Sequence, residues 1–283
     1  MRRRLQIPEA LLGALLLIGS PVAAQDTAPA GSASADIAPS EAAQKPALAL
    51  FGTIPIYWGE GDGMEDVLAG TATAHWARAV LEQGHTLHPL ATLLPQELAG
   101  HDALLIAQPR VLNPAENVAL DEWVRGGGRL LLFADPLLSA ESRYPLGDSR
   151  RPQDVVLLSP LLRHWGLDLR FAAEQSRTRN VREIAGVLLP HQLSGTFAAL
   201  PDAAGCEIQG SGIIADCRIG AGRVTIVADA DLLDLYHPAA GAEEAVLALV
   251  QRTFGSAGIA LQNSDLPGPA HAQAVDKAVQ NDP

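Results

Sequence analysis

The sequence predicts an α/β fold built on a doubly wound, mainly parallel sheet. Three observations support this prediction. Strand-like and helix-like segments alternate from residue 47 to residue 134. An amphipathic helix, a run of glycines and a buried strand follow one another over residues 119–136, and a second continuous apolar strand occupies residues 222–228.

The helix and strand before residue 136 carry the clearest local signals. Asn113 stands at an N-cap position, Pro114 suits the first helical turn, and Glu116 falls at the capping-box position. The glycines at 126–128 can end this helix. Residues 129–134 then contain four consecutive large apolar side chains, which is typical of a strand buried on both faces of a parallel sheet.

The segments before this helix complete the first half of the sheet. Residues 47–58 predict a first strand, in which Pro55 indicates an irregular or edge position. A helix at 71–83, a short strand at 85–90 and a buried strand at 103–107 follow. This order is that of an open, doubly wound sheet of the flavodoxin or class I amidotransferase type.

The pattern changes after residue 136. Residues 137–154 form a long polar insertion, followed by a short helix at 159–165 and a strand at 168–171. Residues 187–218 predict short antiparallel strands and a small hairpin. The strand at 222–228 leads to a turn rich in aspartate and then to a final amphipathic helix, which we expect at 241–254.

The two ends of the chain differ in composition from the middle. Residues 1–24 combine three arginines, an apolar core and small residues before Gln25, which predicts a cleaved signal peptide and a periplasmic protein. The alternative is an uncleaved anchor, but the apolar stretch is shorter than the roughly 20 residues that span a bilayer. Residues 25–46 and 262–283 predict a disordered linker and a disordered tail, leaving one α/β domain at 47–261.

The net charge restricts the possible partners. It is -12 for the whole chain, and loss of the basic leader makes the exported part more acidic still. Such a protein should not bind nucleic acid or an anionic membrane surface through its net charge. No segment after the leader predicts a membrane span, so we expect none after signal cleavage.

The sequence contains two cysteines, Cys206 and Cys217, and both lie in the exported part. They flank a glycine-containing segment that suits a hairpin, so we expect a local disulfide in an oxidising periplasm. A metal pair is disfavoured because no nearby histidine or third cysteine completes a tetrahedral set.

Polar side chains gather where the predicted strands end, which is where doubly wound sheets bind ligands. The candidates are Glu60, Asp62, Gln108, Arg110, Asp135, Asp229 and Asp231. In one hypothesis, Asp135, Asp229 and Asp231 hold a divalent cation or a polyol, and Arg150 or Arg151 from the insertion closes over an anionic group. In the other, these aspartates cap helices or form local turns.

The motifs of common hydrolases and nucleotide-binding proteins are absent from the sequence. It has no Gly-x-Ser-x-Gly or Gly-x-Cys-x-Gly elbow, no His-Glu-x-x-His and no phosphate-binding Gly-x-x-x-x-Gly-Lys. We therefore expect a protein that binds rather than catalyses and that needs no cofactor, with a divalent cation as the alternative.

Two blocks resemble a known family. Residues 119–136 and 222–234 resemble the helix, the strands and the Asp-x-Asp turn of the exported domain in auxiliary proteins of gliding-motility-type ABC transporters. The resemblance implies a class I glutamine amidotransferase-like fold without the catalytic nucleophile, and partners among envelope or ABC transporter proteins. Family members usually carry transmembrane helices, which this chain does not predict.

These observations predict an exported, non-catalytic binding or scaffolding domain, auxiliary to an envelope ABC transport system. Two alternatives remain open at this point. One is a metal-dependent hydrolase that uses the strand-end carboxylates. The other is a periplasmic module that binds a small ligand.

Overall fold

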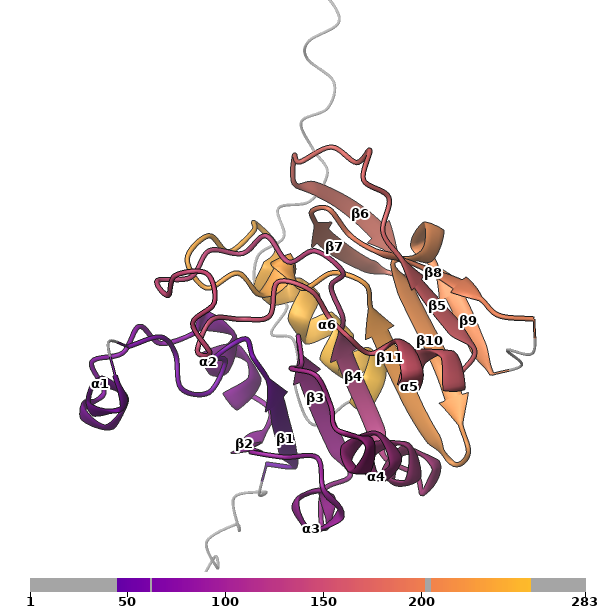
Figure 1. The fold of residues 1–283 in the computed structure, drawn as a ribbon, viewed down its shortest axis with the longest axis horizontal. Helices are drawn as coiled ribbons and strands as arrows, with labels where there is room; N and C mark the ends of the chain where they lie inside the picture. The colour runs from indigo at the N-terminus through magenta and orange to yellow at the C-terminus, as the bar shows by residue number, and fades with distance from the viewer. Residues whose placement is uncertain (1–44, 62, 202–204, 256–283) are drawn as a thin grey trace, which may run out of the picture. The chain divides into compact units, whose positions relative to one another are not determined.

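A mainly parallel sheet organises the fold in the computed structural model, which describes residues 45–61, 63–201 and 205–255. Seven strands form this sheet in the order β2-β1-β3-β4-β11-β10-β9 (Figure 1). They are β1 (Ala47–Gly52), β2 (Thr86–Pro89), β3 (Ala103–Ala107), β4 (Arg129–Phe133), β9 (Cys206–Gln209), β10 (Ile214–Ile219) and β11 (Gly222–Val227).

The sheet is parallel over five strands and antiparallel at one side. β2, β1, β3, β4 and β11 pair in parallel, whereas β10 and β9 run antiparallel to their neighbours. Two further antiparallel pairs join β5 (Leu167–Arg170) to β8 (Thr196–Ala199) and β6 (Asn180–Ile184) to β7 (Val187–His191). The predicted mixed α/β fold with antiparallel strands in its second half is confirmed, although β6 begins before the predicted region.

Helices cover both faces of the main sheet. α2 (Trp76–Glu82) and α6 (Ala242–Phe254) pack on one face. α3 (Pro95–Leu98), α4 (Pro114–Arg125) and α5 (Ser159–His164) pack on the other. α1 (Met64–Ala69) and two short 3-10 turns, η1 (Gly210–Gly212) and η2 (Asp231–Leu233), lie in connections between strands.

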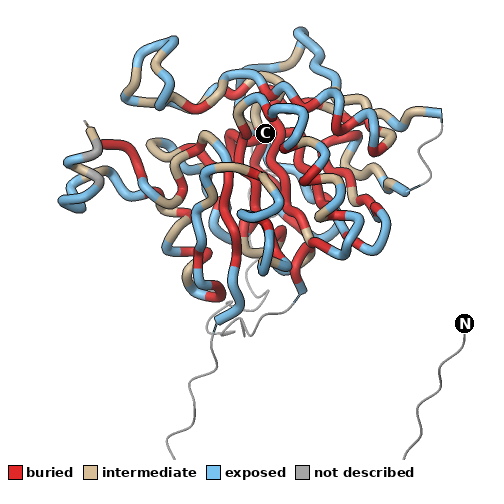
Figure 2. Tube along the Cα trace, turned by 60° about the horizontal axis from the view of Figure 1, so that its bottom comes forward, coloured by how far each residue is buried: buried red, intermediate tan, exposed pale blue. Residues whose placement is uncertain are grey.

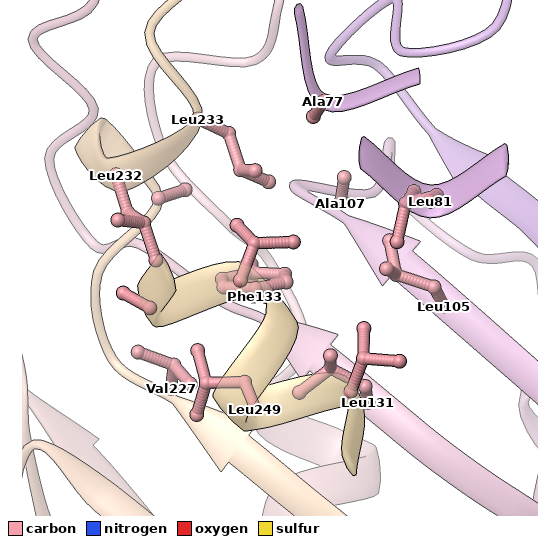
Figure 3. Close-up of a cluster of buried hydrophobic side chains, with 14 of the residues drawn as sticks. Ala77, Leu81, Leu105, Ala107, Leu131, Phe133, Val227, Leu232, Leu233 and Leu249 are labelled. Carbon is pink, nitrogen blue, oxygen red and sulfur yellow. The ribbon is translucent and has the colours of Figure 1, made fainter. Parts of the chain in front are cut away.

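Alternating side chains of the central strands build two apolar cores. Leu131 and Phe133 of β4 pack with Leu249 of α6, as Figure 3 shows, whereas Leu130 and Leu132 belong to the core under α4. These four β4 side chains have no exposed surface. Burial of each contributes roughly 1.5–3 kcal/mol, so the central strands, which Figure 2 colours as buried, supply much of the stability of the fold.

The capping box at the start of α4 is present as predicted. The Asn113 side chain accepts a hydrogen bond from the Glu116 backbone N–H at 2.9 Å, and the Glu116 carboxylate accepts one from the Asn113 N–H at 3.1 Å. Two backbone donors that the helix leaves unpaired are thereby satisfied.

Some predicted boundaries in the first half are wrong. β1 ends at Gly52 rather than at residue 58, because Gly52 has a φ of +146° and the chain turns there. The Thr53 N–H donates to the Ala107 carbonyl across this turn. α2 begins at Trp76, since the buried His75 side chain caps it, and the helices α1 and α3 were not predicted.

The predicted disulfide is confirmed. Cys206 of β9 and Cys217 of β10 face each other in the antiparallel register, and their sulfur atoms are bonded. Such a bond is typical of a protein that folds outside the reducing cytosol. The predicted signal peptide, most of the linker and the predicted tail lie outside the described residues. Within the described part of the chain, no helix has the length and hydrophobicity to cross a membrane.

We expect the disulfide to stabilise the fold. It closes a loop with a sequence separation of 11 residues, so reduction should lower the free energy of unfolding by about 2–3 kcal/mol. Urea denaturation with and without reductant measures this change. The Cys206→Ala/Cys217→Ala protein is the control and should not respond to reductant; equal stability of the oxidised and reduced native protein would contradict the prediction.

Candidate functional site

Three buried aspartates meet at the carboxyl edge of the parallel sheet. Asp135 follows β4, and Asp229 and Asp231 follow β11, the next strand in the sheet. Each offers a carboxylate oxygen within 4.8 Å of the others, and their exposed fractions are 0%, 0% and 2%. The register that pairs Phe133 with Val227 places the two strand ends level and brings these residues together.

The Asp135 carboxylate joins two loops. One oxygen accepts a hydrogen bond from the Leu137 N–H at 2.8 Å, within its own loop. The other accepts one from the Ala230 N–H at 2.9 Å, in the loop after β11. Gln108 supports the same loop from β3, because its side-chain amide bonds both the N–H and the carbonyl of Asp135.

The other two aspartates bond further segments in the same manner. Asp229 accepts from the Gln192 N–H at 2.8 Å, which ties the end of β7 to the end of β11. Asp231 accepts from the backbone N–H and the hydroxyl of Ser139, at 3.1 and 2.9 Å, and so holds the start of the insertion. The three carboxylates therefore connect loops that are distant in sequence.

Burial and mutual repulsion make these acids weak. Burial raises the pKa of Asp135 to about 7 and that of Asp231 to about 6. It also raises the pKa of Asp229 well above the usual value, and the charges of its two neighbours add to this rise. Near neutral pH the cluster can hold protons, which lowers the cost of keeping three carboxyl groups together.

The same geometry is compatible with a cation. Carboxylate oxygens are the ligands that calcium and magnesium prefer, and the Asp135 and Asp229 oxygens that accept one N–H bond each keep a second lone pair. A divalent cation would displace the protons and favour the ionised carboxylates. Asp135, Asp229 and Asp231 are thus the residues that would hold a metal.

Glu60 lies in a second polar cluster near α1. Its carboxylate is 1% exposed and accepts hydrogen bonds from the Ser142 hydroxyl, the Arg143 N–H and the Tyr236 hydroxyl at 2.8, 3.0 and 2.9 Å. The Tyr144 hydroxyl adds a bond to the Gly61 carbonyl. These contacts fasten the insertion to the loop after β1, and Asp62 lies outside the described residues.

An open cavity of about 410 Å³ adjoins the Glu60 cluster. Its lining residues are Thr73, Glu141, Ser142, Arg143 and Tyr236. Burial and the bond to Glu60 raise the pKa of Tyr236 to about 12, so its hydroxyl stays a hydrogen-bond donor at physiological pH. We call this cavity the Tyr236 cleft.

Sequence patterns did not indicate Ser142 or Tyr236. The Tyr236 N–H donates to the Asp234 side chain at 2.9 Å in a local turn. An aspartate two residues before the tyrosine is the local pattern that could have predicted this turn. The contact between Tyr236 and Glu60 spans 176 residues of sequence and leaves no local pattern.

Arg110 is not part of either acidic cluster. Its guanidinium forms a bidentate ion pair with Glu116, with N–O distances of 2.7 and 2.8 Å, and lies over the Phe51 ring. The hydrogen bonds from Arg110 lower the pKa of Glu116 to about 2. These contacts fix the start of α4, so the position of Arg110 favours a structural role.

Arg150 and Arg151, two of the three arginines of the insertion, make contacts within the insertion itself. Arg150 pairs with Asp148 at 2.7 Å and lies over the Tyr144 ring. Arg151 donates to the Tyr144 carbonyl at 3.1 Å and to Asp154 at 3.3 Å. These bonds stabilise the insertion, and closure of either guanidinium over an anionic group at the aspartates stays a prediction.

Comparison with known proteins gives structural neighbours alone. No family model and no curated protein matches the chain. Solved structures with some similarity include the exo-β-1,4-mannosidase Op5Man5 from Opitutaceae bacterium strain TAV5 (TM-score 0.40, 16% identity, 74% of this chain and 34% of that one). Another is the mmIFT52 N-terminal domain (TM-score 0.45, 11% identity, 73% of this chain and 96% of that one). A third is a putative ThuA-like protein from Bacteroides uniformis (TM-score 0.38, 11% identity, 76% of this chain and 96% of that one).

These similarities are distant. The chain spans about a third of the length of the mannosidase and of the β-galactosidases that it also matches. Similarity at this level carries no argument about function, which must come from the residues of the site.

The raised pKa values predict a pH-dependent effect of Asp229→Asn. The folded protein keeps the Asp229 proton well above pH 4, where the unfolded chain releases it, so this carboxyl group destabilises the fold progressively as pH rises. Buried His75, whose pKa is lowered to about 4, changes stability in the opposite direction over part of this range. Because His75 is present in both, the quantity to measure is the difference in the free energy of unfolding between Asp229→Asn and the native protein.

We expect the stability of Asp229→Asn relative to the native protein to rise with pH above about pH 4, by on the order of 1 kcal/mol per pH unit while the native carboxyl group keeps its proton. Urea denaturation at several pH values measures it. Asp154→Asn, which changes a half-exposed carboxyl group, is the control and should show no such trend. A stability difference for Asp229→Asn that is constant with pH would contradict the prediction.

Proposed function

We propose that this chain is an exported, non-catalytic binding domain of the bacterial envelope, and that the Tyr236 cleft contacts its partner. The observation that carries the proposal is the use of the strand-end carboxylates. Asp135, Asp229 and Asp231 bond backbone N–H groups of separate loops, and Glu60 bonds the insertion. These acids therefore serve to build a fixed surface.

A fixed surface favours binding because little conformational entropy is lost when a partner docks. The insertion is held at Ser139 by Asp231 and at Ser142 and Arg143 by Glu60. The cleft beside these anchor points is consequently preformed.

The lining of the cleft favours a polar partner segment. Hydroxyl groups of Thr73, Ser142 and Tyr236 lie beside the oppositely charged side chains of Glu141 and Arg143. Such a set can both donate and accept hydrogen bonds and can pair with either charge. We infer that it receives a polar loop of an envelope protein.

Three further observations support the compartment and context of this proposal. The disulfide fits an extracytoplasmic protein. The five parallel strands have the neighbour order of flavodoxin-type doubly wound sheets, which bind ligands at this same edge. The resemblance of residues 119–136 and 222–234 to auxiliary proteins of gliding-motility-type ABC transporters points to a component of an envelope transport system as the partner.

Two other functions have a specific observation in their favour. The proximity of three carboxylate oxygens favours a metal-dependent hydrolase built on Asp135, Asp229 and Asp231. The volume of the Tyr236 cleft favours a module for a small polar ligand. We rank both below the binding domain because the hydrogen bonds of the acids already account for their positions.

Site-specific photo-crosslinking in cells tests the proposed partner surface. A photoreactive residue in place of Glu141, which is 72% exposed, should give an adduct with a defined envelope protein, and Arg143→Ala should abolish it. The matched control replaces Glu183, an exposed glutamate of β6, and should give no such adduct. No adduct at position 141, or the same adduct at both positions, would contradict the proposal.

Thermal unfolding with metals tests the hydrolase alternative. If the acids are structural, calcium, magnesium, manganese, zinc and EDTA should each leave the melting temperature of the native protein unchanged. A rise of several degrees with one ion, absent in Asp229→Ala, would instead assign the three aspartates to a metal site.

A further inference from the structure

Three arginines form a row across the main sheet at its amino edge. Arg218 of β10 pairs with Arg223 of β11, and Arg223 pairs with Arg129 of β4. Directly paired residues of neighbouring strands point to the same face of a sheet. Here that face is the one that α6 covers, because Val227 of β11 packs in the core with α6. The row lies at the start of β4 and β11, at the opposite edge from the three aspartates.

The backbone holds Arg218 and Arg223 especially close. They are the second residue pair from a two-residue hairpin turn that begins at Gly220, which has a φ of +61°. Their own N–H groups donate to the carbonyl groups of Gly205 and Gly128, which precede β9 and β4. Arg218 and Arg223 therefore form a non-hydrogen-bonded pair, in which side chains approach most closely. Like charges directly opposite each other destabilise a sheet unless a counter-charge joins them.

The neighbouring arginines have protein partners. Arg129 donates to the Phe254 carbonyl at the end of α6, and Arg252 pairs with Asp216. Arg218 and Arg223, in contrast, are exposed, and among residues 45–61, 63–201 and 205–255 neither guanidinium group has a hydrogen bond or an ion pair. Their positive charges are thus uncompensated by the described part of the protein.

Both side chains line an open cavity of about 480 Å³. Arg252, Asp216 and Glu207 also line it. Asp216 accepts hydrogen bonds from Arg252 and from the Thr225 hydroxyl. Among the described lining residues, Glu207 is then the one remaining acidic side chain beside the two guanidinium groups of Arg218 and Arg223. The cavity has a surplus of positive charge in a chain with a net charge of -12.

We propose that this cavity binds a small phosphate, either free phosphate or the phosphate group of a monoester. Guanidinium groups bind phosphate oxygens in a bidentate manner, and a dianion matches the two charges of the Arg218–Arg223 pair. Binding removes the repulsion that the hairpin imposes on this pair. The site is independent of the Tyr236 cleft, since no residue lines both cavities.

Isothermal titration calorimetry of the full chain with inorganic phosphate, near neutral pH and at constant ionic strength, tests the proposal. We expect saturable binding at one site, tighter for phosphate than for acetate. Arg218→Gln/Arg223→Gln should weaken it by about tenfold or more, because each lost charge-assisted bond is worth more than 1 kcal/mol. Arg170→Gln, which removes an exposed arginine that pairs with Asp168 elsewhere, should retain the native affinity.

The melting temperature in chloride buffer shows whether the double variant is folded. It should equal or exceed that of the native protein, since the substitution removes a like-charge pair. Two results would overturn the proposal: no saturable phosphate binding by the native protein in the millimolar range, or undiminished binding by the folded double variant. Equal affinity for acetate and phosphate would overturn the assignment to phosphate.

Discussion

The pairing of β4 with β11 is the interaction on which the rest of the structure depends. These strands are separated by almost 90 residues, yet they lie side by side in parallel, with Phe133 level with Val227. The pairing places Asp135 beside Asp229 at one edge and Arg129 beside Arg223 at the other. All of the chain between the two strands, including the insertion and the small antiparallel sheets, must be accommodated around this pair.

The two edges of the sheet differ in the sign and in the burial of their charged side chains. At the carboxyl edge the aspartates are buried, accept backbone N–H bonds from separate loops and have raised pKa values. At the amino edge Arg218 and Arg223 are exposed and face a cavity. Buried carboxyl groups that accept backbone N–H bonds fix the positions of loops, whereas exposed and uncompensated charges are available to a ligand. This contrast is the physical basis for assigning the acids to loop positioning and the arginine pair to binding.

The sequence predicted features that depend on local patterns. The Asn113 capping box, the buried strand before Asp135 and the Cys206–Cys217 hairpin follow from spacing over a few residues, and each is present. Features that depend on distant contacts were missed. Nothing local links Glu60 to Tyr236. Arg110 became a candidate because it follows a predicted strand, but in the structure it pairs with Glu116, a carboxylate that also accepts the N–H of Leu93, 23 residues earlier.

The central claim is that the strand-end aspartates hold loops together. Amide hydrogen exchange at Leu137, Gln192 and Ala230, whose N–H groups bond Asp135 or Asp229, tests it most directly. In Asp135→Ala, measured without metal, the account predicts faster exchange at Leu137 and Ala230 together, in two loops that are distant in sequence, while Leu131 in β4 keeps its protection. The account would be contradicted if, without metal, Leu137 and Ala230 exchanged at the same rate in Asp135→Ala as in the native protein. Protection of these amides in the native protein only after addition of a divalent cation would assign the aspartates to a metal site instead.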